Sequence, residues 1–261
     1  YLLRPSGKGW KHEVVYSECN NGFYPTLFSV GNEALPNQLL HFSFDGYFLE
    51  HSKRTALGQW TSRRVTPFWH GLYLKSRQDA EGNVHCVYRS DRFKDIESEH
   101  YYALFSGDEL QQHPFPATKI LAFPDLALGR QRNPVFVTAR RQASSDRKEL
   151  HLTKFDKGKW SDLAAVPNVL VEGLADIDSD AAGYIWLTSL QPAHQRVCLG
   201  VFDGERWSLN WLPFPDHQQP PRHVTSLFND KGKHAVLLGC LKEESGWLSA
   251  YFVPTSSATS P

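Results

Sequence analysis

Tryptophan recurs in this chain just after a glycine-containing turn, and the spacing of these tryptophans constrains the fold more than any other feature. Trp10, Trp60, Trp160 and Trp207 each follow a glycine within three residues, at intervals of 50, 100 and 47 residues. Self-similarity with a period of about 20–50 residues is typical of repeat architectures. The sequence therefore consists of repeated units of about fifty residues each.

Each unit contains short runs rich in Val, Leu, Phe, Tyr and Thr, separated by turns with Gly, Asp and Asn, which is the pattern of β-strands joined by tight hairpins. A weaker strand follows the tryptophan, at 62–65 and 208–211. Four strands per unit is the composition of a β-propeller blade. The expected strands are 23–30, 38–44 and 47–51; 70–75, 84–89 and 100–105; 120–128, 134–140 and 150–155; 170–177, 184–189 and 197–202; 224–228, 234–240 and 248–253.

The sequence predicts an all-β fold, a β-propeller of four-stranded antiparallel blades. We expect five blades in one domain over 1–254, or six or seven if the chain is a fragment of a larger ring. The N-terminal segment 1–15 would complete the last blade, because it looks like the third and fourth strands of a unit. The expected blades are 22–66, 70–116, 119–166, 170–213 and 223–254 with 1–15, followed by a disordered Ser/Thr-rich tail at 255–261.

Composition limits the classes of partner. The chain has 28 basic and 28 acidic residues, which argues against nucleic acid, whose recognition needs a basic stripe. It contains no apolar run long enough to insert into a membrane. We expect a soluble protein, cytoplasmic, or secreted or periplasmic after removal of an N-terminal segment. The partners expected are a glycan or small-molecule ligand, with a protein partner as a further possibility.

Cysteine and aspartate patterns favour structural roles over metal or cofactor binding. Cys86, Cys198 and Cys240 fall inside expected strands, where single thiols are commonly buried and inert. The acidic turns at 79–82, 178–183 and 229–232 lack the longer ligand series of a calcium loop, so hairpin chemistry explains them better. We expect no metal and no cofactor.

The densest group of chemically versatile residues lies in the second unit. His, Tyr and Arg together could neutralise a carboxylate, abstract a proton and return one, as a uronate lyase requires. Alternation along the strand puts His85 and Arg89 on one face. If the protein is an enzyme, the catalytic candidates are His70, His85, Arg89 and Tyr101. The alternative is that these polar residues merely line a wet channel.

A carbohydrate site combines an aromatic face with a few hydrogen-bonding groups. The 34 aromatic residues of the chain fit that use, although many aromatic residues also pack in the core of a propeller. The ligand-binding candidates open or line the expected inner strands near one rim. They are Tyr24, His41, Trp69, His70, Tyr73, Arg89, Trp186 and His223.

The units resemble the broad family of BNR or sialidase-like propeller repeats. The resemblance lies in residues 24–27, 39–45, 82–88 and 183–188 and covers nearly the whole chain, but it concerns architecture. Members of that family include lectins, glycoside hydrolases, polysaccharide lyases and interaction modules. Five-bladed glycosidases place acidic residues on inner strands, where this chain has Asp125 and Asp176.

Three functions follow from these observations. The leading hypothesis is a non-catalytic propeller that recognises a glycan through rim loops and the channel mouth. The second is a polysaccharide-active enzyme, either a uronate lyase or a glycoside hydrolase. The third is a protein-interaction module of a larger protein. Fold alone does not decide among them.

Overall fold

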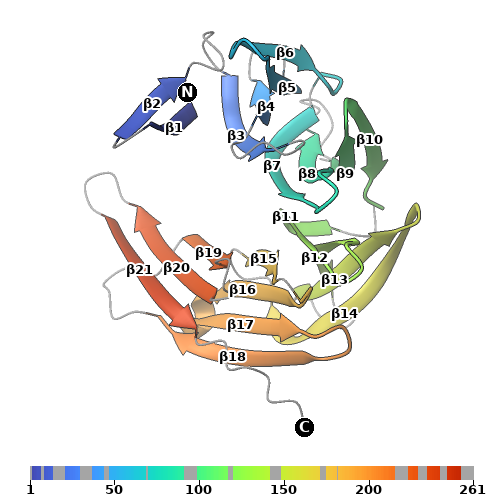
Figure 1. The fold of residues 1–261 in the computed structure, drawn as a ribbon. Helices are drawn as coiled ribbons and strands as arrows, with labels where there is room; N and C mark the ends of the chain where they lie inside the picture. Colours follow the sequence, from blue (N-terminus) through green and yellow to red (C-terminus); the bar gives the residue numbers. More distant parts are fainter. Residues whose placement is uncertain are drawn as a thin grey trace. The chain divides into compact units, whose positions relative to one another are not determined.

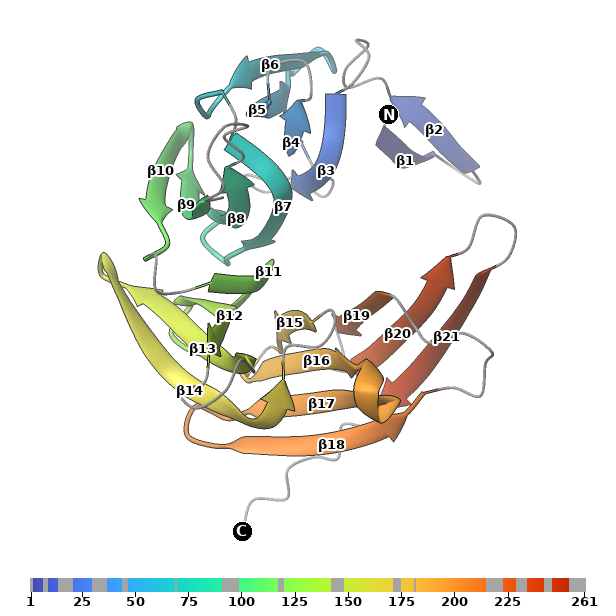
Figure 2. The same cartoon turned by 180° about the vertical axis from the view of Figure 1, so that it is seen from behind.

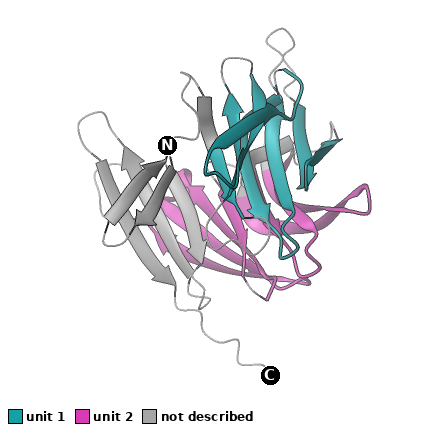
Figure 3. Ribbon diagram, turned by 45° about the horizontal axis from the view of Figure 1, so that its top comes forward, with its two compact units in different colours: residues 1–115 teal, residues 116–261 magenta. Residues whose placement is uncertain are grey.

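The computed structural model describes residues 2–6, 9–13, 21–29, 37–43, 47–68, 70–90, 99–116, 120–141, 148–170, 175–180, 182–214, 223–228, 234–241 and 246–253. Over these residues the chain forms β-strands and a single short 3-10 turn, Pro192–His194. It divides into two compact units, Tyr1–Phe115 and Pro116–Pro261 (Figure 3). The all-β prediction is confirmed.

Unit 1 contains two four-stranded antiparallel sheets in which strands that follow one another along the chain pair (Figure 1). One sheet has the order β3-β4-β5-β6 and the other β7-β8-β9-β10, while β1 and β2 form a hairpin. The bounds are β1 Leu2–Ser6, β2 Gly9–Glu13, β3 Asn21–Phe28, β4 Gln38–Ser43, β5 Phe48–Arg54, β6 Trp60–Arg64, β7 His70–Gln78, β8 Val84–Ser90, β9 Glu99–Ser106 and β10 Glu109–Pro114.

The two four-stranded sheets of unit 1 pack together through an apolar cluster. The first sheet contributes Leu40, Phe42 and Leu49, and the second contributes Cys86 and Phe105 among others. Successive side chains of a strand point to opposite faces, so residues two apart, such as Leu40 and Phe42 of β4, lie on the same face. The hydrophobic effect holds these faces together.

Unit 2 contains two further four-stranded meanders and a three-stranded sheet (Figure 2). An apolar cluster that includes Val137, Leu152, Leu187 and Phe202 joins the two four-stranded sheets. The bounds are β11 Ile120–Leu128, β12 Pro134–Arg141, β13 Lys148–Asp156, β14 Lys159–Leu170, β15 Ala175–Ser179, β16 Ile185–Gln191, β17 Arg196–Phe202, β18 Trp207–Pro213, β19 His223–Phe228, β20 His234–Leu241 and β21 Gly246–Val253.

The expected strands agree with these bounds to within a few residues, with one correction. The run 170–177 was expected as one strand, but Leu170 ends the long outer strand β14 and β15 begins at Ala175. Residues 171–174, the tail 255–261 and the turn 229–232 lie outside the described residues. The number of blades and the closure of the ring through segment 1–15 stay predictions.

The repeated tryptophan stands at the beginning of an outer strand: Trp60 and Trp207 are the first residues of β6 and β18, and Trp160 is the second residue of β14. Trp160 pairs with Phe155 and Trp207 pairs with Phe202, with ring centroids 4.8 and 5.3 Å apart. Trp207 packs against the apolar cluster that joins the two four-stranded sheets of unit 2. In the second unit of the repeat, Leu110 occupies this position and packs against the cluster of unit 1.

Two other structural predictions can be compared with the structure directly. Cys86 and Cys198 are buried free thiols, and burial raises the pKa of each to about 12, so both are inert at neutral pH. The turn aspartates cap their hairpins: Asp79 accepts from the backbone N–H of Asn83, and Asp180 from that of Tyr184. These hydrogen bonds confirm the hairpin interpretation of both turns.

Candidate functional site

The polar residues of the sheet β7–β10 divide between its two ends. In an antiparallel meander, the start of β7, the end of β8 and the start of β9 fall at the same end. The register places His70 opposite Ser90 and Ser90 opposite Glu99, with Arg89 opposite His100 in the next row. We call this the His70 end of the sheet.

Backbone contacts with the first sheet fix the start of β7. The His70 N–H donates to the Tyr47 carbonyl at 3.0 Å, and the Thr66 hydroxyl donates to the His70 carbonyl at 3.3 Å. The same hydroxyl accepts from the Leu49 N–H at 2.8 Å. Gly71 has φ 127°, and an added Cβ would lie 2.6 Å from the Leu49 side chain, so only glycine fits there. His70 is therefore held in place by its own backbone.

An aromatic and carboxylate group surrounds His70 on one face of the sheet. The ring centroids of His70 and Tyr101 are 4.9 Å apart, and Tyr101 stacks on Tyr88 at 5.8 Å. The Tyr101 hydroxyl donates to Glu99 Oε2 at 2.5 Å, and Gln112 donates to the Tyr88 hydroxyl. Tyr101 thus has a carboxylate that can accept its proton, in a charge-assisted hydrogen bond.

Arg89 and His100 lie at the same end but on the opposite face of the sheet. Burial, reinforced by the charge of Arg89, lowers the pKa of His100 to about 4. The imidazole is therefore neutral at pH 7. This pair offers a cation beside a neutral hydrogen-bonding ring, an arrangement suited to a ligand carboxylate or hydroxyl.

Tyr73 breaks the regular pairing of the inner strand β7. The register shifts between Leu72 and Lys75, and Tyr73 within this bulge has φ 55° and a side chain 47% exposed. A positive φ in a bulky residue is uncommon and carries strain. Bulges re-aim side chains and are over-represented next to active sites. The bulge exposes the aromatic ring of Tyr73 to solvent, three residues after His70 at the start of β7.

Matching irregularities occur in two other inner strands. In β3 the register shifts between Phe23 and Thr26, so Tyr24 lies within the shift, and in β11 it shifts over Leu121–Leu126. The Ser76 hydroxyl donates to Thr26 Oγ1 at 2.8 Å, which aligns β7 with β3. The backbones of Tyr24 and Tyr73 consequently lie at similar levels on neighbouring inner strands of unit 1.

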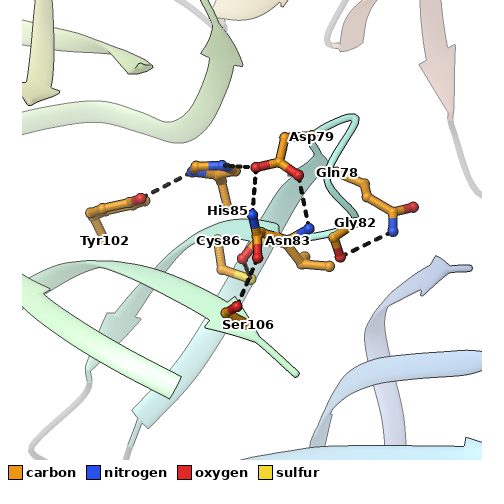
Figure 4. A network of polar contacts seen from close by, with 9 residues as sticks. Gln78, Asp79, Gly82, Asn83, His85, Cys86, Tyr102 and Ser106 are labelled. Atoms are coloured by element: carbon orange, nitrogen blue, oxygen red, sulfur yellow. Dashed lines mark hydrogen bonds and ion pairs between the residues drawn. The ribbon is translucent and has the colours of Figure 1, made fainter. Parts of the chain in front are cut away.

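His85 belongs to a separate network at the opposite, hairpin end of the same sheet (Figure 4). Its Nδ1 lies 3.0 Å from the Tyr102 hydroxyl and its Nε2 3.3 Å from Asp79 Oδ2. Asn83 donates to Asp79, and Ser106 donates to Asn83. Burial lowers the pKa of His85 although Asp79 opposes it, while hydrogen bonds from Asn83 and His85 hold the pKa of Asp79 low against its burial. This network organises the β7–β8 turn.

The structure therefore brings together His70 and Tyr101 of the predicted catalytic set, places Arg89 at the same end but on the opposite face, and separates His85 from all three. His85 and Arg89 are four residues apart on β8, or roughly 13 Å at a rise of about 3.3 Å per residue. Sequence reasoning missed Glu99 and Gln112, which contact the tyrosines of this end. The signal was available, because Glu99 falls on β9, which pairs with β8, and Gln112 falls on β10, which pairs with β9.

The other predicted ligand residues lie elsewhere. His41 is buried on β4, with Nε2 3.1 Å from the Ser52 hydroxyl, and burial lowers its pKa to about 4. The Trp186 indole N–H donates to the turn carboxylate of Asp180 at 3.1 Å. Trp69 lies outside the described residues, while Tyr24 and His223 are described only as members of β3 and β19.

Asp125, one of the two inner-strand acids, has a structural role. It is buried, and its carboxylate accepts from the N–H of Leu126 at 2.9 Å and from that of Ile177 at 3.1 Å. These bonds tie the bulged strand β11 to β15. Asp176 is also buried, at the start of β15.

Known sequences and structures were compared with this chain. No protein-family model matches it, and no curated protein sequence matches it. Its structure is similar to that of a protein of unknown function from Dyadobacter fermentans, with TM-score 0.58 and 14% identity over 95% of this chain and 84% of that one.

The α-L-arabinofuranosidase Arb93A from Fusarium graminearum gives TM-score 0.55 and 13% identity over 95% and 82% of the two chains. The polysaccharide lyase Uly1 gives TM-score 0.50 and 13% identity over 83% of this chain and 54% of that one. At such identities the likeness concerns the fold. The chain is a multi-blade β-propeller built from four-stranded antiparallel sheets. Within the described residues, no helix is long and apolar enough to cross a membrane.

Proposed function

We propose that this propeller recognises carbohydrate at the His70 end of the sheet β7–β10, with the ring of Tyr73 as the surface on which a sugar packs. The observation that carries the proposal is the backbone of Tyr73, which is held at φ 55° with its ring exposed. A tyrosine ring combines an apolar face with a polar tip, which suits a sugar face and its hydroxyls. Strain at an exposed aromatic residue is what a binding role would maintain.

The polar groups at the His70 end support a polar ligand. Glu99 and Tyr101 supply acceptors and a donor on one face of the sheet, while Arg89 lies on the other face. Ligand sites commonly combine an apolar surface with a few convergent polar groups. The names of the similar structures, an arabinofuranosidase and a polysaccharide lyase, favour carbohydrate over other polar ligands. The proposal includes two finer statements: that this protein binds carbohydrate as a lectin does, and that its repeats belong to the BNR-like family.

The variant Tyr73→Gly tests the proposal. Glycine adopts positive φ without strain, so the variant should unfold at the same or a higher denaturant concentration, with a gain of up to about 1 kcal/mol. Binding to an oligosaccharide identified on a glycan array should weaken about tenfold or more. The control is Leu57→Gly, since Leu57 is 87% exposed in a turn of the other sheet.

Three results would count against recognition at this end. The array could show no bound glycan, Tyr73→Gly could bind as tightly as the wild type, or Leu57→Gly could lose binding equally. Calorimetry with the array-selected oligosaccharide measures all three affinities on one scale.

The second candidate is a polysaccharide-active enzyme, favoured by the short hydrogen bond between Tyr101 and Glu99 beside His70. In a lyase acting on uronate residues, Tyr101 would pass its own proton to Glu99 and remove the proton on the carbon next to the carboxylate. Arg89 is on the opposite face of the sheet, so it has no role in this step. Cleavage of the bond to the leaving oxygen then creates a carbon–carbon double bond, and His70 would protonate that oxygen.

Ultraviolet absorbance of the new double bond tests this candidate with uronic-acid polysaccharides. Tyr101→Phe should abolish the signal, whereas His85→Gln should retain it because His85 serves the distant turn. Absence of any absorbance change with the wild type rejects the lyase. Loss of activity in both variants rejects the division of the sheet into two ends.

A further inference from the structure

Unit 2 contains a pocket at the turn end of its two four-stranded sheets, apart from the His70 end of unit 1. The pocket has a volume of about 240 Å³ and lies between the β11–β12 turn and the sheet β15–β18. Its apolar lining includes Leu163 and Phe202, and its polar lining includes Arg130, Asn133 and Lys154. The volume falls just below the roughly 300–1,000 Å³ of pockets for drug-sized ligands, so a single ring fits.

The charge of the pocket is positive. Arg130 and Lys154 line it, and none of the described residues lining it is acidic. The nearest acid in sequence along the turn β17–β18 is Asp203, which accepts from the N–H groups of Glu205 and Arg206 and lies 3.6 Å from Arg206 Nε. The hydrogen bonds from Arg206 and Glu205 lower the pKa of Asp203, and the charge of Arg130 helps to lower it, so a ligand carboxylate would compete with Asp203 for Arg130.

Close packing holds Arg130 in place. Its guanidinium carbon lies 4.6 Å from the centroid of the Tyr184 ring, a cation–π distance. An added Cβ at Gly183 would lie 2.5 Å from the Arg130 Cα, so the two turns meet backbone to backbone. At Gly204 an added Cβ would lie 3.9 Å from Arg130 Nη1. Three turns therefore fix one arginine at the pocket, which reduces the entropy that binding would cost.

We propose that this pocket binds a single uronic acid residue. Arg130 and Lys154 hold its carboxylate, Asn133 meets its hydroxyls, and Leu163 and Phe202 support the apolar face of the ring. A guanidinium binds a carboxylate through paired charge-assisted hydrogen bonds. The choice of a sugar acid rests on the proposed carbohydrate function, while the positive charge and the size of the pocket stand by themselves.

Calorimetric titration with four small ligands separates ring recognition from charge recognition. We expect D-glucuronate to bind at least about tenfold more tightly than D-glucose, which lacks the carboxylate, and than acetate, which lacks the ring. Added salt should weaken the binding of glucuronate. Equal affinity for glucose overturns the role of the cations. Equal affinity for acetate or inorganic phosphate shows a simple anion site and overturns the role of the ring.

Variants place the ligand at the pocket. Arg130→Gln and Lys154→Gln should each weaken glucuronate binding by about tenfold or more, and Lys154→Gln provides a second test if Arg130→Gln unfolds. The control Arg132→Gln changes a neighbouring exposed arginine that does not line the pocket and should bind as the wild type does. Unchanged binding in a folded Lys154→Gln variant overturns the assignment.

The outcomes for this pocket and for the Tyr73 site are distinguishable. Tyr73→Gly should leave glucuronate binding unchanged, because Tyr73 belongs to unit 1 and the pocket to unit 2. Failure of glucuronate to bind, with oligosaccharide binding still dependent on Tyr73, overturns the pocket alone. Binding of glucuronate that depends on Lys154, with no Tyr73-dependent glycan, supports the pocket and rejects the site in unit 1.

Discussion

Two glycines with the same backbone dihedral angle provide a measure of how tightly the sheets of unit 2 pack at their turns. Gly158 and Gly183 both have φ 78°. An added Cβ at Gly158 has nothing within 4 Å, whereas at Gly183 it would lie 2.5 Å from the Arg130 Cα and 2.7 Å from its N. Alanine at both positions therefore carries the same conformational strain, and alanine at Gly183 alone carries a steric conflict with backbone.

The expected free energies follow from these two terms. An L-residue in the left-handed region costs about 1–2 kcal/mol, which is the whole expected effect of Gly158→Ala. Overpacking a close contact adds about 1–3 kcal/mol, and a backbone neighbour cannot move aside as a flexible side chain can. We therefore expect Gly183→Ala to lower the free energy of unfolding by about 2–5 kcal/mol.

Urea unfolding followed by tryptophan fluorescence measures the two variants on the same scale, since the midpoint and slope give the free energy of unfolding. The difference between the variants reports the contact between the β11–β12 and β15–β16 turns. Equal destabilisation by the two alanines would refute the reasoning, because it would mean that the turns are not in contact in solution.

Two further stability predictions concern the indole packing and the buried histidines. Trp207→Ala should cost about 1.5–2.5 kcal/mol, half the value for a fully buried tryptophan. Trp207→Phe should cost under about 1 kcal/mol, because the buried Nε1 has no hydrogen-bond partner among the described residues. Equal urea midpoints for the two variants would contradict this. Burial, reinforced by the charges of Lys53 and Arg63, lowers the pKa of His51 from 6.5 to about 4. Between these two pH values the unfolded chain binds a proton that the folded chain does not. The free energy of unfolding therefore falls as the pH drops from 6.5 to about 4, and levels off below. His51→Gln should reduce that slope of free energy against pH by up to about 1.4 kcal/mol per pH unit, and an unchanged slope in urea titrations would exclude this histidine as a source.

The strands and turns could be predicted because their causes are local. Alternating apolar residues such as Leu150 and Leu152 of β13 determine which face is buried. The Asp79 side chain accepts a hydrogen bond from the Asn83 N–H and Gly82 has a positive φ, and together they fix a tight turn. The exception at Leu170 arose because β14 continues past the expected turn, and a run of apolar residues does not show to which strand it belongs.

The candidate site was predictable only in part. Antiparallel pairing alone places Arg89 near His70 and His85 near the turn, so this division was accessible from the order of residues. The positive φ of Tyr73 was not, because it depends on Gly71 packing against the first sheet and on the resulting shift of register. The register shifts of the two other inner strands did leave a signal in the sequence. Pro25 and Pro124 lie within the shifted segments of β3 and β11, and proline inside a strand often marks a bulge.

Ring-proton NMR of tyrosine tests the carbohydrate site most directly. With tyrosine rings labelled, titration of the array-selected oligosaccharide should shift the signals of Tyr73 and Tyr101. The signal of Tyr102 should stay fixed, because its ring is buried on the opposite face of the sheet from Tyr101 and its hydroxyl lies 3.0 Å from His85 Nδ1. Shifts of Tyr102 without shifts of Tyr73, or a bound glycan that moves neither ring, would contradict binding at the His70 end.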